Sequence, residues 1–467
     1  MTKKACLETF GCQMNQLDSE VIRGMLEEAG FAFTKDPGEA DLILFNTCSV
    51  RKSAENRVHG RLASLKPLKA ARPTVVVAVL GCMAQKDREG LIAEHPHVDI
   101  VCGTQEFPAL LEFVERAHSG ERGIVAAGVH PELDRVFAHR RPRPGQFHAY
   151  VSVMRGCDNY CSYCVVPYVR GREVSRPASD VVEEVRKLVD AGIVEITLLG
   201  QSISSYGKNL QHGGTGIPAC PDGVRQECLT HHWPENLATL LRKVAAVRGL
   251  RRLGFITSHP ADMTRDVFEA MRELPTIAPY LHMPAQSGST AVLTRMNRGY
   301  TRERYLELVR EAKETVPGVA IASDFIVGFP GETDDEFRET ASLVEACRFS
   351  QGFIFKYSPR PGTKAAGFPD DVPKATKESR NQELLAVQER ISTEENAAFV
   401  GRSVEVLVEG PSKRNPKRLA GRARDHRIVL LDIPCATGGL PASALTGNIV
   451  SATITRATAL ALYAEKP

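Results

Sequence analysis

The chain has 467 residues, of which 25% are charged and 43% hydrophobic, and its formal net charge is +3. This length exceeds what one hydrophobic core serves, so two to four domains are expected. The composition is that of a globular protein, and no apolar run approaches the roughly 18 residues of a membrane helix, so we expect no membrane association. Twelve cysteines behind an amino terminus that lacks a signal peptide favour metal or redox chemistry over disulfides. We therefore expect a cytoplasmic protein.

Residues 1 to about 140 alternate predicted strands and helices. The strands are expected at residues 4–10, 41–47 and 74–80, and the helices at 16–30, 52–68 and 107–118. Such alternation is typical of parallel βαβ units, so an N-terminal domain over residues 1–129 is predicted to be an open, doubly wound α/β sheet. Ligands of these sheets collect at the carboxyl ends of the strands.

A cysteine follows each of the three predicted strands. Cys12 lies in FGCQMN, Cys48 in NTCSVR and Cys82 in LGCMAQ. Separations of 36 and 34 residues match the length of a βαβ unit, which brings successive strand ends together. The pattern predicts a three-cysteine cluster site, and the alternative is three unrelated buried thiols. Cys6 and Cys102 lack the pattern and are expected to be core thiols.

Residues 130–145 are rich in proline and arginine and are predicted to be an interdomain linker. Arg140, Arg141 and Arg143 are available for phosphate contact there. We expect a solvated linker instead.

Three cysteines lie within eight residues at Cys157, Cys161 and Cys164, in the pattern C-x3-C-x2-C. Thiolates at this spacing can hold three corners of an iron–sulfur cube and leave one iron open to an external ligand. A zinc knuckle or a partial disulfide framework is the alternative. Zinc normally takes four ligands, and this stretch offers three at uneven spacing.

A second alternation fills a predicted central domain over residues 146–373. Strands are expected at residues 147–153, 195–199, 250–256, 280–283, 320–327 and 352–356, with helices between them. Polar or glycine residues follow several of these strands, where barrel folds place their sites. The alternative for each is ordinary loop polarity or turn chemistry.

The loop of residues 206–234 contains Cys220, Cys228, His231 and His232. Zinc is conceivable, but the C-x7-C-x2-H-H spacing is not a standard ligand pattern. We expect a surface insertion whose role the sequence leaves open.

The last predicted domain, residues 374–467, begins with a charged helix at 374–399. Short strands follow at residues 403–409, 418–423, 428–432 and 449–456, which predicts a small β-barrel. Residues 401–467 contain ten Lys or Arg against five Asp or Glu, so positive charge is concentrated here. The stretches SKRNPKRL and GRARDHR suit contact with RNA phosphate, and the alternative is a solvated charged face.

These motifs together resemble the methylthiotransferases, a family of radical S-adenosylmethionine (SAM) enzymes. The resemblance covers almost the whole chain and includes, besides the cysteine motifs, LLGQS, FITSHP, HMPAQSGS, SDFIVGFPGET and SPRPGTKAA. NTCSVR and FITSHP favour the branch that acts on N6-dimethylallyladenosine in tRNA. Sister branches act on threonylcarbamoyl-adenosine in tRNA or on ribosomal protein S12.

The resemblance implies two 4Fe-4S clusters, with SAM as the further cofactor. Cys157, Cys161 and Cys164 would hold the cluster that cleaves SAM, and Cys12, Cys48 and Cys82 an auxiliary cluster for sulfur transfer. It also implies a partial (β/α)6 barrel and a TRAM-like RNA-binding β-barrel. Contacts to SAM or substrate are expected from the strand-end residues Gly200, Gln201, Ser258, Gln286, Ser287, Asp324 and Gly328.

Arginines beside the cluster loop have two interpretations. Arg170, Arg172 and Arg176 can meet the SAM carboxylate or a phosphate. They can equally form structural ion pairs with Glu173 or Asp180.

The function that the resemblance implies is conversion of N6-dimethylallyladenosine at tRNA position 37 to its 2-methylthio derivative, using two SAM. Its partners would be the tRNA anticodon stem-loop and a low-potential electron donor such as flavodoxin or ferredoxin, and the chain is expected to be a monomer. A hypothesis of another class is a non-catalytic iron–sulfur RNA-binding sensor, which needs no SAM site.

Overall fold

The computed structural model describes residues 2–49, 52–130, 139–210, 235–432 and 445–465. The chain forms two compact units. The first comprises Met1–Pro142, Met154–Tyr160 and Cys164–Arg176, and the second comprises Arg143–Val153, Cys161–Tyr163 and Pro177–Pro467. Cys220, Cys228, His231 and His232 lie outside the described residues.

The first unit is built on a six-stranded parallel sheet with the strand order β2-β1-β3-β4-β5-β6. The strands are β1 (Lys4–Phe10), β2 (Ala32–Phe33), β3 (Leu42–Thr47), β4 (Val76–Gly81), β5 (Ile100–Cys102) and β6 (Ile124–Ala126). Every residue of β3 and β4 is buried, as expected for central strands covered on both faces. The order places the ends of β1, β3 and β4 side by side.

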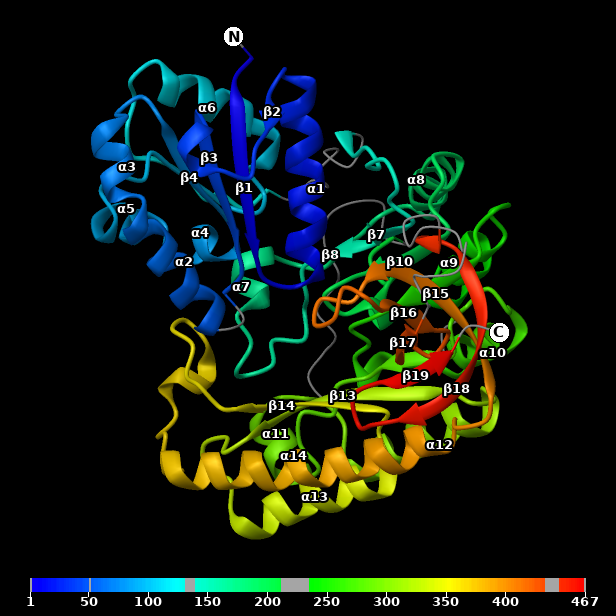
Figure 1. Ribbon diagram of the computed structural model, residues 1–467. Helices are drawn as coiled ribbons and strands as arrows, with labels where there is room; N and C mark the ends of the chain where they lie inside the picture. Colours follow the sequence, from blue (N-terminus) through cyan, green and yellow to red (C-terminus); the bar gives the residue numbers. More distant parts are fainter. Residues whose placement is uncertain (1, 50–51, 131–138, 211–234, 433–444, 466–467) are drawn as a thin grey trace. The chain divides into compact units, whose positions relative to one another are not determined.

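Helices cover both faces of this sheet. They are α1 (Gln13–Glu28), α2 (Lys52–Ser64), α3 (Lys66–Ala71), α4 (Cys82–Asp87), α5 (Glu89–Glu94) and α6 (Leu110–His118). One apolar layer includes Ile22 of α1 and Leu110 of α6, and the opposite layer includes Val58 of α2 and Leu91 of α5. Figure 1 shows α1 on one side of the blue strands and α2 on the other. The predicted doubly wound fold is confirmed.

The first unit also contains most of the cysteine loop that follows residue 153. A short antiparallel pair, β8 (Met154–Arg155) and β9 (Val174–Ser175), closes the base of the loop. Helix α7 (Val166–Arg170) follows its last cysteine and packs Val169 against Cys82. The helix ends at Gly171, which has a positive φ of 79°.

The second unit contains six further parallel strands. They are β7 (His148–Ser152), β10 (Glu195–Leu199), β11 (Arg252–Phe255), β12 (Tyr280–His282), β13 (Ala320–Val327) and β14 (Gln351–Lys356). They pair in the orders β11-β10-β7 and β12-β13-β14, and a bridge from Leu253 to Ile277 continues the first set toward the second. The predicted partial (β/α)6 barrel is confirmed.

Helices connect these strands in the alternation that the sequence predicts. They are α8 (Ala178–Asp190), α9 (Leu237–Ala245), α10 (Arg265–Glu273), α11 (Thr290–Arg295), α12 (Arg302–Thr315) and α13 (Asp334–Cys347). Helix α8 begins at Ala178, and Pro177 occupies its cap position.

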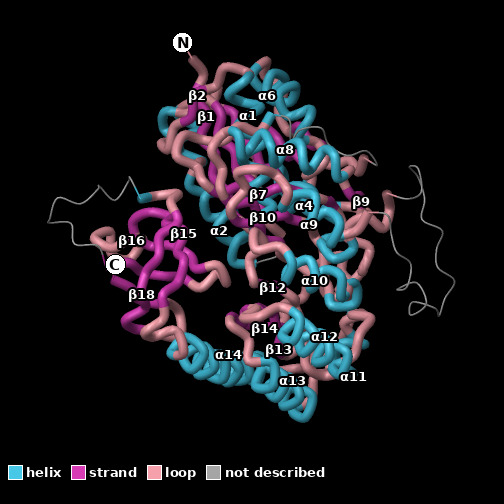
Figure 2. The backbone as a smooth tube through the Cα atoms, turned by 90° about the vertical axis from the view of Figure 1, so that its right-hand side faces the viewer, coloured by secondary structure: helices cyan, strands magenta, loops and turns pink. Residues whose placement is uncertain are grey.

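The long helix α14 (Lys374–Ala397) lies beside α13 and leads to a closed β-barrel, as Figures 1 and 2 show. Its strands are β15 (Ser403–Pro411), β16 (Leu419–Ala423), β17 (Ile428–Asp432), β18 (Ile449–Ala457) and β19 (Leu462–Glu465), paired in the order β15-β16-β17-β19-β18. The sequence predicted four of these five strands. The short β19 was missed, although its parallel pairing with β17 is what closes the barrel.

Two further findings bear on the sequence predictions. Arg140 was expected on a solvated linker, but it is 8% exposed and pairs with Glu20 of α1. The linker at Arg140 therefore packs on α1. Cys6 and Cys102 are buried in the two apolar layers of the N-terminal sheet, as predicted. Within the described residues, no helix combines the length and the apolar character that crossing a membrane requires.

Candidate functional site

The three N-terminal cysteines follow three adjacent strands of the first unit. Cys12 follows β1 and precedes α1, Cys48 follows β3, and Cys82 follows β4 as the first residue of α4. Because β1, β3 and β4 are neighbours, their carboxyl ends bring the three sulfur atoms to one edge of the sheet. A hydrogen bond from the Cys48 thiol, with a contribution from Arg170, lowers the pKa of Cys12 to about 6.

The glycine before Cys12 is required by close packing. A Cβ on Gly11 would lie 2.7 Å from the Cβ of Cys48 and 2.3 Å from Oδ1 of Asn15, so a larger residue would push the two cysteine loops apart. Gly81, before Cys82, has a φ of 92°, and its Cβ would lie 2.7 Å from the carbonyl oxygen of Thr47.

A buried amide network fixes the spacing of these strand ends. The Asn15 side chain donates to the Thr47 carbonyl (3.1 Å), and the Asn46 side chain donates to the Asn15 carbonyl (2.8 Å). The Thr47 hydroxyl donates to the carbonyl of Leu80 on the next strand (2.7 Å). Neither Asn15 nor Asn46 was among the predicted site residues, although both lie in the motifs that contain Cys12 and Cys48.

Arg170 of α7 brings a positive charge to this cysteine set. Its Nε lies 3.2 Å from Sγ of Cys82, and its Nη2 lies 2.6 Å from a carboxylate oxygen of Asp18. The residue is 7% exposed, so the ion pair acts in a medium of low dielectric constant. Burial raises the pKa of the Cys82 thiol, and Arg170 opposes that effect. A guanidinium donor at this distance stabilises a thiolate, the form in which cysteine binds metal.

Two of the three arginines beside the cysteine loop form ion pairs other than those expected from sequence. Arg170 pairs with Asp18, which lies 152 positions away, and Arg172 pairs with Asp158 across a 2.7 Å contact. The expected partners were Glu173 and Asp180. These two guanidinium groups are thus engaged with carboxylates of the first unit.

Within the first unit, the start of the cysteine loop is held by the backbone. Cys157 is buried, and its amide donates to the carbonyl of Gly171 (3.2 Å). A Cβ on Gly156, which has a φ of 73°, would lie 1.9 Å from the carbonyl oxygen of Arg172. Glycine is therefore required at position 156. The amide group of Asn159 donates to Sγ of Cys157 at 3.5 Å.

The middle cysteine of the loop belongs to the second unit, where another buried arginine contacts it. Nη1 of Arg298 lies 3.3 Å from Sγ of Cys161. The remaining guanidinium nitrogens donate to the hydroxyl of Tyr300 (3.0 Å) and the carbonyl of Pro284 (2.9 Å). The backbone carbonyl of the next residue, Ser162, accepts a hydrogen bond from the amide of Ala365. The backbone amide of Ser162 donates to the carbonyl of Met296. Arg298 was not among the predicted site residues.

Both sets of cysteines fit an iron–sulfur cluster by the chemistry of their donors. Thiolates are the usual ligands of such clusters, and hydrogen bonds to the sulfurs set their potentials. In each set, a buried guanidinium lies within hydrogen-bond distance of one sulfur. Its positive charge offsets the cost of burying a negatively charged thiolate.

Several predicted SAM-contacting residues lie at strand ends of the second unit with unused hydrogen-bonding groups. Among the described residues, both amide atoms of Gln201 and the hydroxyl of Ser258 are buried without a hydrogen-bond partner. The carbonyl of the neighbouring Gly200 accepts a hydrogen bond from Thr257. Buried polar groups without partners cost roughly 1–3 kcal/mol each, so such groups at strand ends fit a polar ligand.

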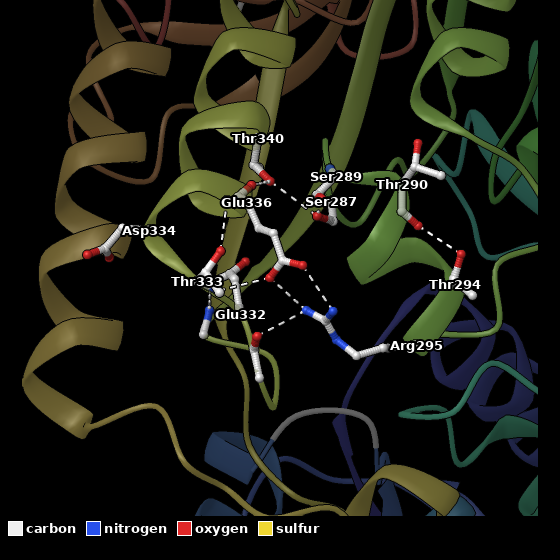
Figure 3. Close-up of polar contacts among 12 residues, drawn as sticks. Ser287, Ser289, Thr290, Thr294, Arg295, Glu332, Thr333, Asp334, Glu336 and Thr340 are labelled. Carbon is white, nitrogen blue, oxygen red and sulfur yellow. Dashed lines mark hydrogen bonds and ion pairs between the residues drawn. The ribbon is translucent and has the colours of Figure 1, made fainter.

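The hydroxyl of Ser287 faces α13 instead of open space. It lies 3.1 Å from the hydroxyl of Thr340, which also accepts the amide of Gly288 (2.9 Å), as Figure 3 shows for the two side chains. Nearby, Arg295 forms an ion pair with Glu336 near the start of the same helix. These contacts fix the loop after β12 on α13.

The other predicted contact residues are also held in place. Gln286 has a positive φ of 69°, and its backbone amide donates a hydrogen bond to the backbone carbonyl of Asp324 (2.8 Å). The Asp324 carboxylate pairs with His282 at 2.9 Å. Gly328 has a φ of 69°, and its Cβ would lie 2.3 Å from Cγ of Lys377 on α14, so packing against α14 already requires this glycine.

Comparisons with known proteins agree with this fold and these motifs. The profile of the uncharacterized protein family UPF0004 matches residues 4–103, and the Radical SAM superfamily matches residues 151–344. A solved structure of the radical S-adenosylmethionine methyltransferase TsrM from Kitasatospora setae is similar in fold, with a TM-score of 0.53 and 14% identity over 78% of this chain and 77% of that one. The chain is thus a radical SAM protein.

Two relatives define the family more closely. Proteins named tRNA-2-methylthio-N(6)-dimethylallyladenosine synthase from Rhodopirellula baltica and Moorella thermoacetica are 43% and 41% identical to this chain. The alignments cover 92% of this chain and 90% of the first relative, and 98% of this chain and 97% of the second. The chain belongs to this methylthiotransferase family, as its motifs predicted.

Proposed function

We propose that this chain converts N6-dimethylallyladenosine at position 37 of tRNA to its 2-methylthio derivative, using two SAM and two 4Fe-4S clusters. The observation that carries the proposal is identity above 40% over nearly the full length of relatives with that activity in their name. The convergence of Cys12, Cys48 and Cys82 at one sheet edge supports it, because a second cluster distinguishes sulfur insertion from simpler radical chemistry.

Each cysteine set has a separate role in this proposal. Cys157, Cys161 and Cys164 hold the cluster that receives SAM, and Cys12, Cys48 and Cys82 hold the auxiliary cluster. Bound there, the first cluster supplies a low-potential electron for cleavage of SAM, and the second supplies a site for the sulfur that is transferred. The aromatic C–H bond at C2 is too unreactive for acid–base catalysis, which is why a radical cofactor is needed.

The side chains of the barrel bind and orient the small-molecule groups. Gln201 and Ser258 present buried, unsatisfied hydrogen-bonding groups at the ends of β10 and β11, where SAM or the target base would satisfy them. Gly200 lies beside Gln201 after β10, Asp324 lies within β13, and Gly328 directly follows β13. The remaining two predicted residues, Gln286 and Ser287, shape the loop after β12, which Thr340 anchors to α13.

The C-terminal barrel contributes tRNA binding through one of its two basic stretches. Lys413, Arg414 and Lys417, on the loop between β15 and β16, are exposed and suit phosphate contact. The second stretch, GRARDHR, is used within the protein, since Arg422 pairs with Glu195 and Arg427 with Asp425. An unpaired base of an anticodon loop can be splayed out toward the site, as is usual in RNA recognition.

The remaining partners follow from the proposed chemistry. Reduction requires a low-potential electron donor such as flavodoxin or ferredoxin. We propose a cytoplasmic monomer that engages the anticodon stem-loop.

The test is an assay of the anaerobically reconstituted chain with SAM, a reductant and RNA that contains N6-dimethylallyladenosine. Mass spectrometry should detect both 5′-deoxyadenosine and the 2-methylthio nucleoside. Cys157→Ala should abolish 5′-deoxyadenosine, whereas Cys48→Ala should spare some SAM cleavage and abolish the thiomethylated product.

Parallel reactions with threonylcarbamoyl-adenosine RNA and with ribosomal protein S12 distinguish the sister activities. Thiomethylation of either of these substrates, without thiomethylation of the N6-dimethylallyladenosine RNA, would overturn the substrate assignment. Complete absence of 5′-deoxyadenosine from the wild-type chain would favour a non-catalytic iron–sulfur sensor.

A further inference from the structure

Three potential metal ligands converge in the first unit on helices that the proposed reaction does not use. His59 lies on α2, Glu94 is the last residue of α5, and His95 caps the end of that helix. Nδ1 of His59 lies 2.9 Å from Nε2 of His95 and 3.2 Å from Oε1 of Glu94, and the latter two atoms are 3.6 Å apart. One oxygen and two nitrogens thus face a common point.

The three separations, from 2.9 to 3.6 Å, bracket the ligand spacing around a small divalent cation. Zinc binds histidine nitrogen and carboxylate oxygen at about 2.0–2.2 Å, so tetrahedral ligand atoms lie roughly 3.3–3.5 Å from one another. Two imidazoles and one carboxylate form a ligand set that zinc commonly accepts, with a fourth position for water. The side chains of His59 and Glu94 are 29% and 60% exposed, which leaves a route for the ion and for that water.

The burial of His95 distinguishes this cluster from an ordinary surface ion pair. Its side chain is 6% exposed, and within the described residues its Nδ1 has no hydrogen-bond partner. The polar contacts of this ring therefore run through Nε2, the atom that faces His59 and Glu94.

The surrounding charges are compatible with a cation. Asp87, at the end of α4, interacts electrostatically with His59. The positive charge of Lys66 on α3 disfavours a cation at His95, but this side chain is exposed and solvent screens its charge. His97 packs edge-on against His95 while its own Nε2 contacts the carbonyl of Leu62, so it is occupied outside the cluster.

We propose that His59, Glu94 and His95 form a binding site for a divalent transition-metal ion, with Zn²⁺ as the preferred occupant. The ion would join α2 to the end of α5. Helix α2 follows the Cys48 loop and α5 follows the helix that begins at Cys82, so the site would brace two of the elements that carry the auxiliary cysteines.

The test uses the full chain without an affinity tag, loaded anaerobically with iron and sulfide so that the cluster cysteines do not take up zinc. After removal of loosely bound metal with a chelator, Zn²⁺ is added and binding is measured by calorimetry and elemental analysis. We expect one zinc site per chain in the wild type. Its affinity should fall at least tenfold in His59→Gln and in Glu94→Gln.

His97→Gln is the matched control, because it removes a neighbouring imidazole that is not a proposed ligand, and it should bind zinc as the wild type does. Glu94 is exposed, so Glu94→Gln should fold even if His59→Gln does not. Equal zinc uptake by the wild type and Glu94→Gln would overturn the proposal. So would a loss in His97→Gln as large as in the ligand variants.

Discussion

Two buried arginines, one in each compact unit, contact a cysteine sulfur, and they differ in how their charge is balanced. Arg170 lies 3.2 Å from Cys82 and is paired with the buried carboxylate of Asp18. Arg298 lies 3.3 Å from Cys161, but its other hydrogen bonds go to neutral groups, including the hydroxyl of Tyr300. In the described part of the chain it forms no ion pair with a carboxylate.

This difference separates two roles for the same side chain. The charge of Arg170 is largely compensated by Asp18, so its main contribution is to the stability of the first unit. In the described part of the chain no carboxylate balances the charge of Arg298, so it should act on the potential of a cluster bound at Cys161. Electrostatic interactions of this kind are strong at buried sites and weak in water.

The largest expected effect is the loss of stability when Arg170 is replaced. Arg170→Met leaves the Asp18 carboxylate buried and unpaired, which should lower the free energy of unfolding of the first unit by roughly 3–5 kcal/mol. Hydrogen exchange of β1, β3 and β4 across a urea series measures the loss. Adding Asp18→Asn should restore most of the stability, and failure of that rescue would contradict the charge-pair account.

The next effect is on the reduction potential at the second arginine. Removing a positive charge beside a cluster disfavours the added electron, so Arg298→Met should lower the midpoint potential. A charged hydrogen bond contributes about 1–3 kcal/mol, which corresponds to roughly 50–130 mV for one electron. Electron paramagnetic resonance titration of a Cys12→Ala, Cys48→Ala, Cys82→Ala background isolates this cluster.

Arg295→Met provides the matched control for that titration, since this arginine pairs with Glu336 and does not contact a cysteine side chain through its guanidinium. The midpoint potential of this variant should stay close to that of the wild type. An equal shift in both variants would contradict the specific role of Arg298.

A third arginine, which is partly buried, tests whether such charges affect a neighbouring imidazole. Arg422 lies 3.4 Å from Nδ1 of His426, which also stacks on Tyr280. Burial, with Arg422 and Arg252 nearby, lowers the pKa of His426 to about 3. Below the ordinary pKa near 6.5 the unfolded chain binds a proton that the folded chain does not, so His426 destabilises the fold as the pH falls from 6.5 toward 3.

His426→Asn removes this titration and tolerates the positive φ of 65° at that position. Between pH 7 and pH 5 the variant should lose roughly 1–2 kcal/mol less stability than the wild type. Thermal melts at both pH values provide the comparison. Parallel decreases in the two proteins would show that His426 is readily protonated in the folded state.

The smallest effect concerns the exposed cations of the C-terminal barrel. Replacing Lys413, Arg414 and Lys417 with Gln should leave the melting temperature unchanged and weaken RNA binding. The slope of log affinity against log salt should fall by roughly 0.7–0.9 for each phosphate that the variant no longer neutralises. Binding measured over a salt series checks this, and an unchanged slope would exclude this loop from the RNA interface.

The sequence predicted those features that depend on local pattern. The strand–helix alternation indicated both parallel sheets, and a cysteine after each of β1, β3 and β4 indicated a common edge. The fifth barrel strand, β19, was missed because Leu462–Glu465 is only four residues long and its sequence, LYAE, does not alternate apolar with polar residues.

The features that the sequence did not reveal depend on contacts between distant residues. Nothing near Arg170 indicates that its partner is Asp18, and the two local carboxylates considered as partners are not the ones used. Arg298 lies between Asn297 and Gly299, and nothing in this local sequence indicates that its side chain is buried against Cys161. Ser287 was predicted to contact SAM or substrate, and its packing against Thr340 of α13 could not be read from the sequence.

The most direct test of the central claim is to count iron and sulfide after anaerobic reconstitution. Two clusters of four irons predict about eight irons per wild-type chain. One triple-alanine variant replaces Cys12, Cys48 and Cys82, and the other replaces Cys157, Cys161 and Cys164. Each of these variants should hold about four irons. Mössbauer spectra should assign all of this iron to cubane clusters. About four irons in the wild type, with no further decrease in one of the triple variants, would contradict the account.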